Sequence, residues 1–338
     1  MSNTSQPTRD ESETASSDDL AMMESMLCKE QTIYAQHDYF ARPLPISPED
    51  NGEMPVDPLC RNIMAKWCSS LCKFCSYDRR MVESVMSCVD RFVATPKGSR
   101  ILLSRDQYQL AVMASLYLVA KVQQTQALEP DSVAKLSRGK YSKANIEAME
   151  LAILSSLKWF VNPPTAMGFA HEFIQNYDFV PEDYDDDSDE LSSSSTSSTI
   201  EERIMDLVRC QILEATCDYE LSCQTRPSHI AFGALTNALQ SLNIDSSGLA
   251  SMRMLKNQLQ IIDEDFISTS LLRIVSSSET SSNELSCLLL NRCRGHDSKR
   301  IRSSKRSHKE EQKRSCPGSS SSSSITGSPR TVAKGIVC

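Results

Sequence analysis

One segment, residues 104–122, restricts the fold of this chain more than any other. Ser104, followed three residues later by Gln107, is the capping-box arrangement that begins an α-helix. The residues after it leave almost no polar side on that helix: Leu110, Ala111, Val112, Met113, Ala114, Leu116, Leu118, Val119 and Ala120. A helix that is apolar nearly all round has to be covered by other elements. The segment therefore predicts the central helix of a helical bundle.

Neighbouring segments supply helices that can cover it. Apolar residues recur every three or four positions in residues 63–74, 82–93, 146–157 and 204–213, which is the period of an amphipathic helix. Glycine accounts for only 10 of the 338 residues, well below its usual share of ~7%. No run of strand length alternates apolar with polar residues. The sequence predicts an all-α protein with two helical lobes of about five helices each.

Composition divides the chain into five parts. Residues 1–57 are rich in Ser, Asp, Glu and Pro and predict a disordered N-terminal arm, and residues 279–338 predict a disordered Ser-rich basic tail. Between them lie an N-terminal helical lobe (58–177), an acidic Ser-rich linker (178–199) and a C-terminal helical lobe (200–278). The linker has the composition of rapid-turnover segments and equally of ordinary disordered linkers.

The charge distribution narrows the classes of partner. The net charge of −8 argues against a nucleic-acid binder with a basic body. Positive charge gathers only between Asn291 and Arg314, where ten Lys/Arg and three Asp/Glu give a net +7. This cluster predicts a nuclear localisation signal, with nonspecific binding to polyanions as the alternative. We expect a nuclear protein, or one that shuttles with the cytoplasm, and no apolar run reaches the ~18 residues of a membrane span.

Thirteen cysteines raise the question of disulfides and metal sites. Residues 1–30 lack the apolar core of a signal peptide, which predicts a reducing compartment and free thiols. Cys72 and Cys75 form a lone CxxC, whereas a zinc site would need a second ligand pair. Because Cys68 shares their helix face, we expect buried structural thiols, with no metal and no cofactor.

Two pairs of charged residues stand out on the predicted helices. Asp90 lies on the apolar stripe of its helix, and a buried carboxylate needs a partner. Arg61, which opens the preceding helix, is the natural partner, and an exposed Asp90 at a helix end is the alternative. Lys121 and Glu150 occupy two other helices, and from the residues alone a solvated face is the simpler interpretation.

Residues 60–174 also contain an ordered set of short motifs: Arg61, Met64 and Trp67, Val89-Asp-Arg-Phe92, Gln109-Leu110, Ala120-Lys121, Tyr141-Ser-Lys143, Met149-Glu150, Leu157-Lys-Trp159, and Pro164-Thr165 ahead of Phe169. In this order and spacing they resemble the cyclin box, the five-helix module that activates cyclin-dependent kinases. The second lobe resembles the C-terminal cyclin fold more weakly, through Leu213-Glu-Ala215, Arg226-Pro-Ser228 and Ile230-Ala231. Leu157-Lys-Trp159, without a mitotic-type destruction box in the arm, is typical of D-type or G1 cyclins.

The resemblance implies two cyclin-fold lobes and a regulatory subunit, not an enzyme. Such a subunit binds and activates a cyclin-dependent Ser/Thr kinase and controls G1/S progression. It implies that Lys121 and Glu150 contact the kinase, that the Arg61–Asp90 pair is structural, and that further apolar contacts come from Leu118, Leu154 and Trp159. The sequence departs from the family at Lys66, Gln123 and Gln124, where acidic residues are usual, and this affects kinase choice and affinity.

Two further surfaces follow from the resemblance. A shallow groove that docks Arg-x-Leu peptides of substrates and inhibitors would be lined by Cys60, Ile63, Met64, Trp67, Tyr108 and Gln109; the alternative is that Trp67 is simply part of the core. The segment Met26-Leu-Cys28-Lys-Glu30 resembles the Leu-x-Cys-x-Glu motif by which D-type cyclins bind retinoblastoma-type pocket proteins, with Met in place of the first Leu.

A second class of function shares this fold. A transcription-related cyclin-box protein would be either a transcriptional cyclin or an adaptor similar to transcription factor IIB. The latter class carries an N-terminal zinc ribbon and a basic body, whereas here the N-terminus lacks a CxxC pair and the lobes are acidic. The kinase regulator is therefore the favoured prediction, and the identity of the kinase decides between a cell-cycle and a transcriptional cyclin.

Overall fold

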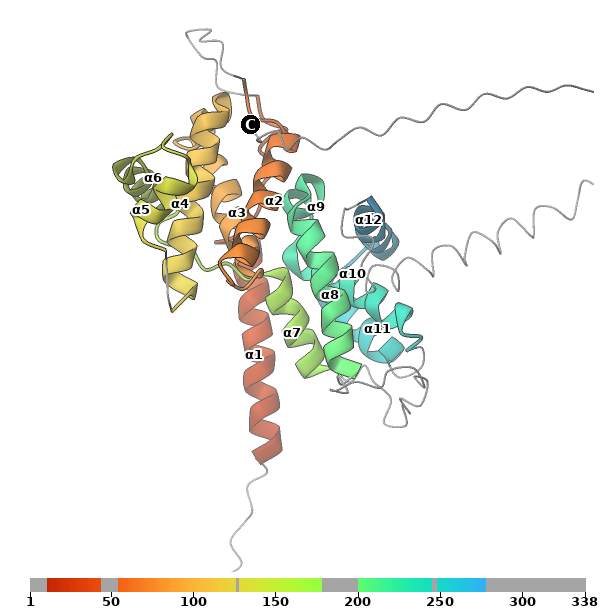
Figure 1. Ribbon diagram of the computed structural model, residues 1–338. Coiled ribbons are helices and arrows are strands. Elements are labelled where there is room, and N and C mark those ends of the chain that lie inside the picture. The colour runs from red at the N-terminus through yellow and green to blue at the C-terminus, as the bar shows by residue number, and fades with distance from the viewer. Residues whose placement is uncertain (1–10, 44–53, 126–127, 178–199, 245–247, 278–338) are drawn as a thin grey trace, which may run out of the picture. The chain divides into compact units, whose positions relative to one another are not determined.

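The computed structural model describes residues 11–43, 54–125, 128–177, 200–244 and 248–277 (Figure 1). These residues form twelve α-helices and one 3-10 helix and contain no β-strand. The prediction of an all-α protein is therefore confirmed. None of the helices in the described part of the chain is both long and apolar enough to span a membrane.

The first lobe is built around α4 (Arg105–Gln123), as the apolar segment predicted. Ser104 begins this helix by accepting a hydrogen bond from the backbone N–H of Gln107. Nearly every residue of α4 from Tyr108 to Ala120 is buried. The elements that surround it are α2 (Pro58–Phe74), α3 (Met81–Val93), η1 (Ser99–Leu103), α5 (Pro130–Leu136) and α6 (Lys143–Ser156).

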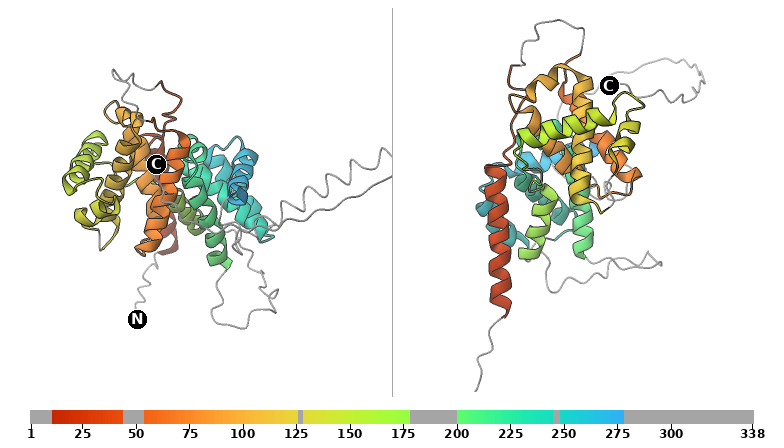
Figure 2. Two further views of the ribbon diagram at one scale, coloured as in Figure 1. Left: turned by 45° about the horizontal axis from the view of Figure 1, so that its top comes forward. Right: turned by 90° about the vertical axis from the view of Figure 1, so that its left-hand side faces the viewer.

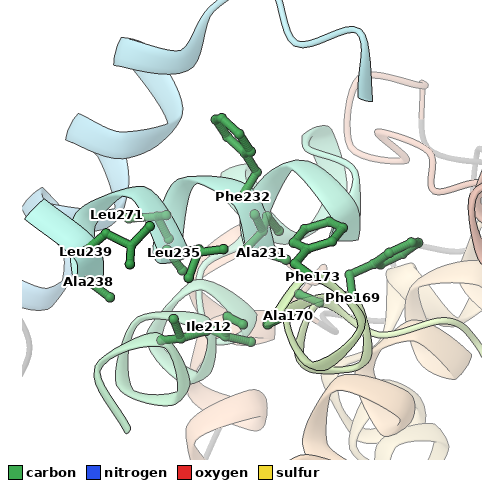
Figure 3. Packing of buried hydrophobic residues seen from close by; sticks show 14 of the residues in the cluster. Phe169, Ala170, Phe173, Ile212, Ala231, Phe232, Leu235, Ala238, Leu239 and Leu271 are labelled. Carbon is green, nitrogen blue, oxygen red and sulfur yellow. The ribbon is translucent and has the colours of Figure 1, made fainter. Parts of the chain in front are cut away.

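The second lobe has α10 (Pro227–Ser241) at its centre, and Figure 3 shows the apolar side chains around it. The helices that pack there are α7 (Ala166–Asn176), α8 (Ile200–Thr216), α9 (Tyr219–Gln224), α11 (Gly248–Leu259) and α12 (Glu264–Ser277). The sequence assigned α7 to the first lobe, but its Phe169 and Phe173 belong to the buried cluster of the second lobe, and α7 contacts α8 and α10. The packing therefore places α7 in the core of the second lobe.

The N-terminal segment differs from its prediction. Helix α1 (Glu11–Gln31) and the residues that follow it, through residue 43, lie within the predicted disordered arm. Met23 is fully buried in the core of the second lobe, and Met26 and Leu27 pack against that core. The helix itself lies beside α7 (Figure 2). This apolar spacing of three and four residues explains why a segment of polar composition is structured. The predicted linker 178–199 and tail 279–338 lie outside the described residues.

Two carboxylates, Glu30 (buried) and Glu83 (half-buried), join the second lobe to the rest of the chain. Glu30 of α1 accepts hydrogen bonds from the backbone N–H (3.1 Å) and the hydroxyl (2.6 Å) of Ser228, at the start of α10. Glu83 of α3 accepts from the backbone N–H groups of Ala166 (2.7 Å) and Met167 (3.3 Å), at the start of α7. Each carboxylate thus satisfies N–H groups that have no partner within their own helix. Burial raises the pKa of Glu30 and raises the pKa of Glu83 to about 7.

The raised pKa of Glu83 predicts a stability that falls as the pH rises. The pKa of this carboxyl is about 7 in the folded protein, against an ordinary value of 4.5. Its contribution to the free energy of unfolding is therefore complete below pH 4.5 and is lost as the pH rises through 7. In Glu83→Gln the amide cannot ionise, so this part of the pH dependence should disappear. We expect the wild type to lose about 2 kcal/mol more than the variant between pH 5 and pH 8. Urea unfolding at both pH values measures the difference, and equal losses in the two proteins would contradict the assignment.

Candidate functional site

A buried arginine organises the junction of the two lobes. Arg61 of α2 is fully buried, and its Nη2 lies 2.9 Å from Oδ2 of Asp90 on α3. The predicted pair is therefore present. Two contacts that the sequence did not indicate complete the network. Arg61 Nη1 donates to the backbone carbonyl of Thr216, where α8 ends (2.6 Å), and the hydroxyl of Tyr39 donates to Asp90 Oδ1 (2.9 Å).

The charges of this network depend on one another. Burial alone would lower the pKa of Arg61, but the Asp90 carboxylate raises it well above its ordinary value. Burial, and then the charge of Asp90, raise the pKa of Tyr39. Its hydroxyl therefore keeps its proton and stays a hydrogen-bond donor to Asp90. The network joins α2, α3, the end of α8 and the N-terminal segment, so its role is structural.

Lys121 and Glu150, the two residues predicted to contact a kinase, lie together, with Lys121 exposed and Glu150 largely buried. They form an ion pair between the last turn of α4 and α6. The Lys121 side chain is 40% exposed and that of Glu150 only 11%. The Lys121 ammonium also lies 4.4 Å from the centre of the Tyr117 ring, a cation–π contact. A partner would meet a lysine that two neighbours already hold in place.

The three apolar residues predicted to lie around this pair are not alike. Leu118 and Leu154 are buried and belong to the core of the first lobe. Trp159 is 68% exposed. Its φ of +66° and the +52° of Lys158 are left-handed values that are rare for residues with a large side chain. The Trp159 N–H donates to the carbonyl of Leu154 (3.0 Å), which closes the end of α6 and leaves the indole exposed.

Three further exposed residues on the same elements were not predicted. Val122, Leu151 and Phe160 are each more than two-fifths exposed, although they are large and apolar. Leu151 is an apolar residue that falls outside the apolar stripe of its helix, and this position is the sequence signal that could have identified it as exposed. We group them with three of the predicted residues as the α4–α6 face, because they belong to the end of α4, to α6 or to the turn that follows α6: Lys121, Val122, Glu150, Leu151, Trp159 and Phe160. Arg91 Nη1 holds the chain there by donating to the carbonyl of Phe160 (2.9 Å).

The predicted groove for Arg-x-Leu peptides is only partly at the surface. Cys60, Met64 and Tyr108 are buried, because they face inward from α2 and from the central helix α4, so the prediction is wrong for them. Ile63 and Trp67 are half-buried. Gln109, also half-buried, accepts hydrogen bonds at Oε1 from the Tyr141 hydroxyl (3.1 Å) and from Lys140 (3.2 Å).

The motif at residues 26–30 lies inside α1. Cys28 is exposed, but Leu27 packs against the second lobe and Glu30 is buried against Ser228. The motif is thus helical, with its glutamate engaged by α10. Binding of a pocket protein stays a prediction.

The residues that depart from the family pattern lie at a helix end and on an outer face. Gln123 Nε2 donates to the Ser84 hydroxyl (2.9 Å), and Gln124 Nε2 lies 3.7 Å from the sulfur of Met81. Both glutamines thus hold the end of α4 against α3. Lys66 is exposed on α2.

Cys68 and Cys72 of α2 and Cys75, which caps its end, are free thiols. Cys68 and Cys72 are buried and Cys75 is half-buried. Burial raises the pKa of Cys72 to about 11, so its thiol stays protonated near neutral pH. Among the described residues no group of three or more His, Cys, Asp or Glu side chains is placed to hold a metal ion.

Known proteins share this sequence pattern. Residues 21–162 match the family model described as the cyclin N-terminal domain, and this region begins within α1. The G1/S-specific cyclin-E1 of Gallus gallus is 25% identical over 120 residues, 36% of this chain and 28% of the relative. The G2/mitotic-specific cyclin-2 of Antirrhinum majus is 27% identical over 139 residues, 41% of this chain and 28% of the relative. The chain thus matches 28% of the length of each of these relatives.

A solved structure shares the fold. The viral cyclin from herpesvirus saimiri superposes with a TM-score of 0.52 at 16% identity, over 77% of this chain and 96% of that one. A likeness at this identity shows the fold alone, and it is the fold that the sequence predicted.

The buried Arg61–Asp90 pair predicts a large loss of stability when one partner is removed. Asp90→Ala should leave a buried arginine without its carboxylate, at a cost of roughly 3–5 kcal/mol. Asp106→Ala is the control, because it removes only an exposed ion pair with Lys140, worth about 0–1 kcal/mol. Urea unfolding measures both variants. Equal small losses would show that the pair contributes little to the fold.

Proposed function

Because the chain is a cyclin-box protein, we propose that it is a regulatory subunit that binds and activates a cyclin-dependent Ser/Thr protein kinase. The observation that carries the proposal is the α4–α6 face, where an exposed tryptophan accompanies the Lys121–Glu150 pair. The resemblance implies that the matched lysine and glutamate bind beside the αC helix of a kinase. That helix must be in place for its glutamate to pair with the catalytic lysine.

The physical character of this face suits a protein partner. Trp159, Leu151 and Phe160 expose apolar surface, and the ring of Phe160 also meets that of Tyr34 edge-on. Exposed apolar surface with an aromatic anchor is typical of interaction sites. The ion pair beside it would be withdrawn from water on binding, so that it adds specificity to the apolar contact.

The narrower proposal is a role at the G1/S transition. Its support is the Leu157-Lys-Trp159 motif, which is typical of D-type and G1 cyclins. The relatives include both a G1/S-specific and a G2/mitotic-specific cyclin, so they do not select a phase. The kinase that co-purifies with the full chain from its own cells tests this step, and a kinase of the transcription machinery would favour a transcriptional cyclin instead.

Removing the Lys121–Glu150 pair should weaken kinase binding without unfolding the protein. Lys121→Ala combined with Glu150→Ala deletes charges that the kinase would desolvate, at a cost of about 2–5 kcal/mol each. The matched control is Lys143→Ala with Glu147→Ala, which removes a solvent-exposed pair from the same helix. Co-purification of the kinase and phosphorylation of a short peptide are measured together with thermal melting.

The control should retain both activities. If the Lys121/Glu150 variant melts like the wild type and still co-purifies with its kinase in full, the α4–α6 face is not the kinase surface.

A pocket protein is a further proposed partner, through residues 26–30. Since Glu30 is bonded to Ser228 in the structure, such a partner would have to bind a form in which α1 has left the second lobe.

The basic cluster between Asn291 and Arg314 is proposed to direct the protein to the nucleus. The cluster lies outside the described residues, and the net charge of +7 is its support. We expect truncation at Cys287 to leave kinase activation in vitro intact and to move a fluorescent fusion from nucleus to cytoplasm. If the truncated protein still accumulates in the nucleus, the basic cluster is not the localisation signal, or the kinase carries the complex in. Replacing Lys121 and Glu150 in the truncated protein separates these outcomes, because loss of nuclear accumulation would then show that the kinase carries it.

A further inference from the structure

Arg91 of α3 is a nearly buried cation that has no carboxylate partner among the described residues. Its side chain is 8% exposed, and the titratable groups that face it are Cys88 and Tyr34. The guanidinium donates to the carbonyl of Phe160 (2.9 Å) and lies 4.5 Å from the centre of the Tyr34 ring. Arginine keeps its charge at neutral pH, and a charge withdrawn from water is costly unless its partners stay in place. Arg91 therefore depends on both of these contacts.

The two contacts belong to segments that lie far apart in the sequence. Phe160 is part of residues 157–160, which follow α6 and carry Trp159, and which we call the α6 turn. Tyr34 comes from the N-terminal segment, directly after α1. The rings of Tyr34 and Phe160 also meet edge-on, with centroids 6.3 Å apart. The cluster around Arg91 thus joins the N-terminal segment to the α4–α6 face.

The position of Tyr34 is set by α1. Its backbone N–H donates to the carbonyl of Lys29 (2.9 Å), so that Tyr34 continues from the last turn of the helix. That turn also carries Glu30, which is bonded to Ser228 of the second lobe. Further back on α1, Met23 is fully buried in the core of the same lobe. The docked helix therefore places the Tyr34 ring over Arg91.

The α6 turn is a strained piece of backbone. Lys158 and Trp159 have φ values of +52° and +66°, and such values persist only where the surroundings hold them. Within the turn, the Trp159 N–H donates to the carbonyl of Leu154 (3.0 Å). From outside, Arg91 of α3 holds the carbonyl of Phe160. Loss of this outside contact lets the turn open more often.

We propose that Tyr34 is a positioning residue that couples the docking of α1 to the order of the α6 turn. With α1 on the second lobe, the Tyr34 ring shields the guanidinium of Arg91, which holds Phe160 and thereby the turn. When α1 leaves, water competes for the guanidinium, its hydrogen bond to Phe160 weakens, and Trp159 loses its fixed place.

This inference rests on the proposed function, because it takes the α4–α6 face as the kinase surface. Release of α1 then lowers the affinity for the kinase, and kinase binding in turn favours the docked helix, since coupling between two sites is reciprocal. A protein that captures residues 26–30 therefore opposes the kinase without touching the kinase surface.

Hydrogen exchange of the full chain, with no kinase present, tests the coupling at the turn itself. The amides followed are those of Trp159 and of Phe160, whose N–H donates to the carbonyl of Leu157 (3.0 Å). Tyr34→Leu keeps an apolar side chain but removes the ring face, so both amides should exchange about tenfold faster or more. Tyr34→Phe keeps the ring and should stay close to the wild type. Unchanged exchange in α4 shows that the first lobe stays folded.

Two adjacent methionines test the part played by α1. Met23→Ala removes a fully buried side chain from the contact of α1 with the second lobe and should speed exchange at the same two amides. Met22→Ala is the matched control, because Met22 is 54% exposed on the same helix. Exchange in α10 shows whether the second lobe itself has loosened. Met23→Ala should add little to Tyr34→Leu, since both act through one contact.

Kinase binding tests the consequence. The kinase that co-purifies with the wild-type chain should bind Tyr34→Leu about threefold more weakly or worse, because fewer molecules hold the turn in its binding form. In a Trp159→Ala background the same substitution should leave the affinity unchanged, because the group that Tyr34 positions is absent. If Trp159→Ala alone leaves kinase binding intact, the proposed kinase surface fails, and the exchange experiment still decides the coupling.

Two results would overturn the proposal. Exchange at Trp159 and Phe160 that stays at the wild-type rate in Tyr34→Leu would show that the tyrosine does not hold the turn. An equal loss of kinase affinity with and without Trp159 would show that Tyr34 contacts the kinase directly.

Discussion

The fold depends on one guanidinium group that is kept out of water. A buried charge is tolerated only where partners surround it, and Arg61 has all of its partners on other elements. Asp90 comes from α3, the Thr216 carbonyl from the end of α8, and Tyr39 reaches the same carboxylate from the N-terminal segment. Both lobes and the N-terminal segment therefore have to take one relative position before this charge is satisfied. The outer side of α2 and the α4–α6 face are held on that same frame.

Part of this arrangement was predictable from the sequence, and the limits have physical reasons. The all-round apolar helix at 104–122 and the aspartate on an apolar stripe gave the centre of the first lobe and the Arg61–Asp90 pair. A side chain that should be buried but carries a charge is a strong signal, since its partner must be another charge nearby. The carbonyl of Thr216 gave no such signal, because every residue has one. Tyr39 precedes Asp90 by 51 residues and lies in a segment that its composition assigned to a disordered arm.

The failures concern which way a helix faces. Met64 and Tyr108 were assigned to a groove on the basis of the resemblance, yet they lie inside, and only neighbouring helices could show this. The disordered arm was predicted from its polar composition, whereas three apolar residues at helical spacing, Met23, Met26 and Leu27, suffice to bury one side of α1. Leu151, the exposed apolar residue of α6, gave a weak signal by falling outside its stripe. The predicted kinase contacts remain predictions that the Lys121/Glu150 variant tests.

The left-handed backbone at Lys158 and Trp159 has a consequence for association. The backbone of this turn is fixed before any partner arrives, by the hydrogen bond from Trp159 to Leu154 and by the contact of Arg91 with Phe160. Fixing the backbone of a flexible loop on binding costs about 1–2 kcal/mol for each residue. A turn that folding has already ordered avoids most of that entropic loss, and only the indole's own rotations about χ1 and χ2 remain to be restricted. The conformational strain of two residues thus makes the most exposed aromatic ring of the α4–α6 face a preorganised anchor.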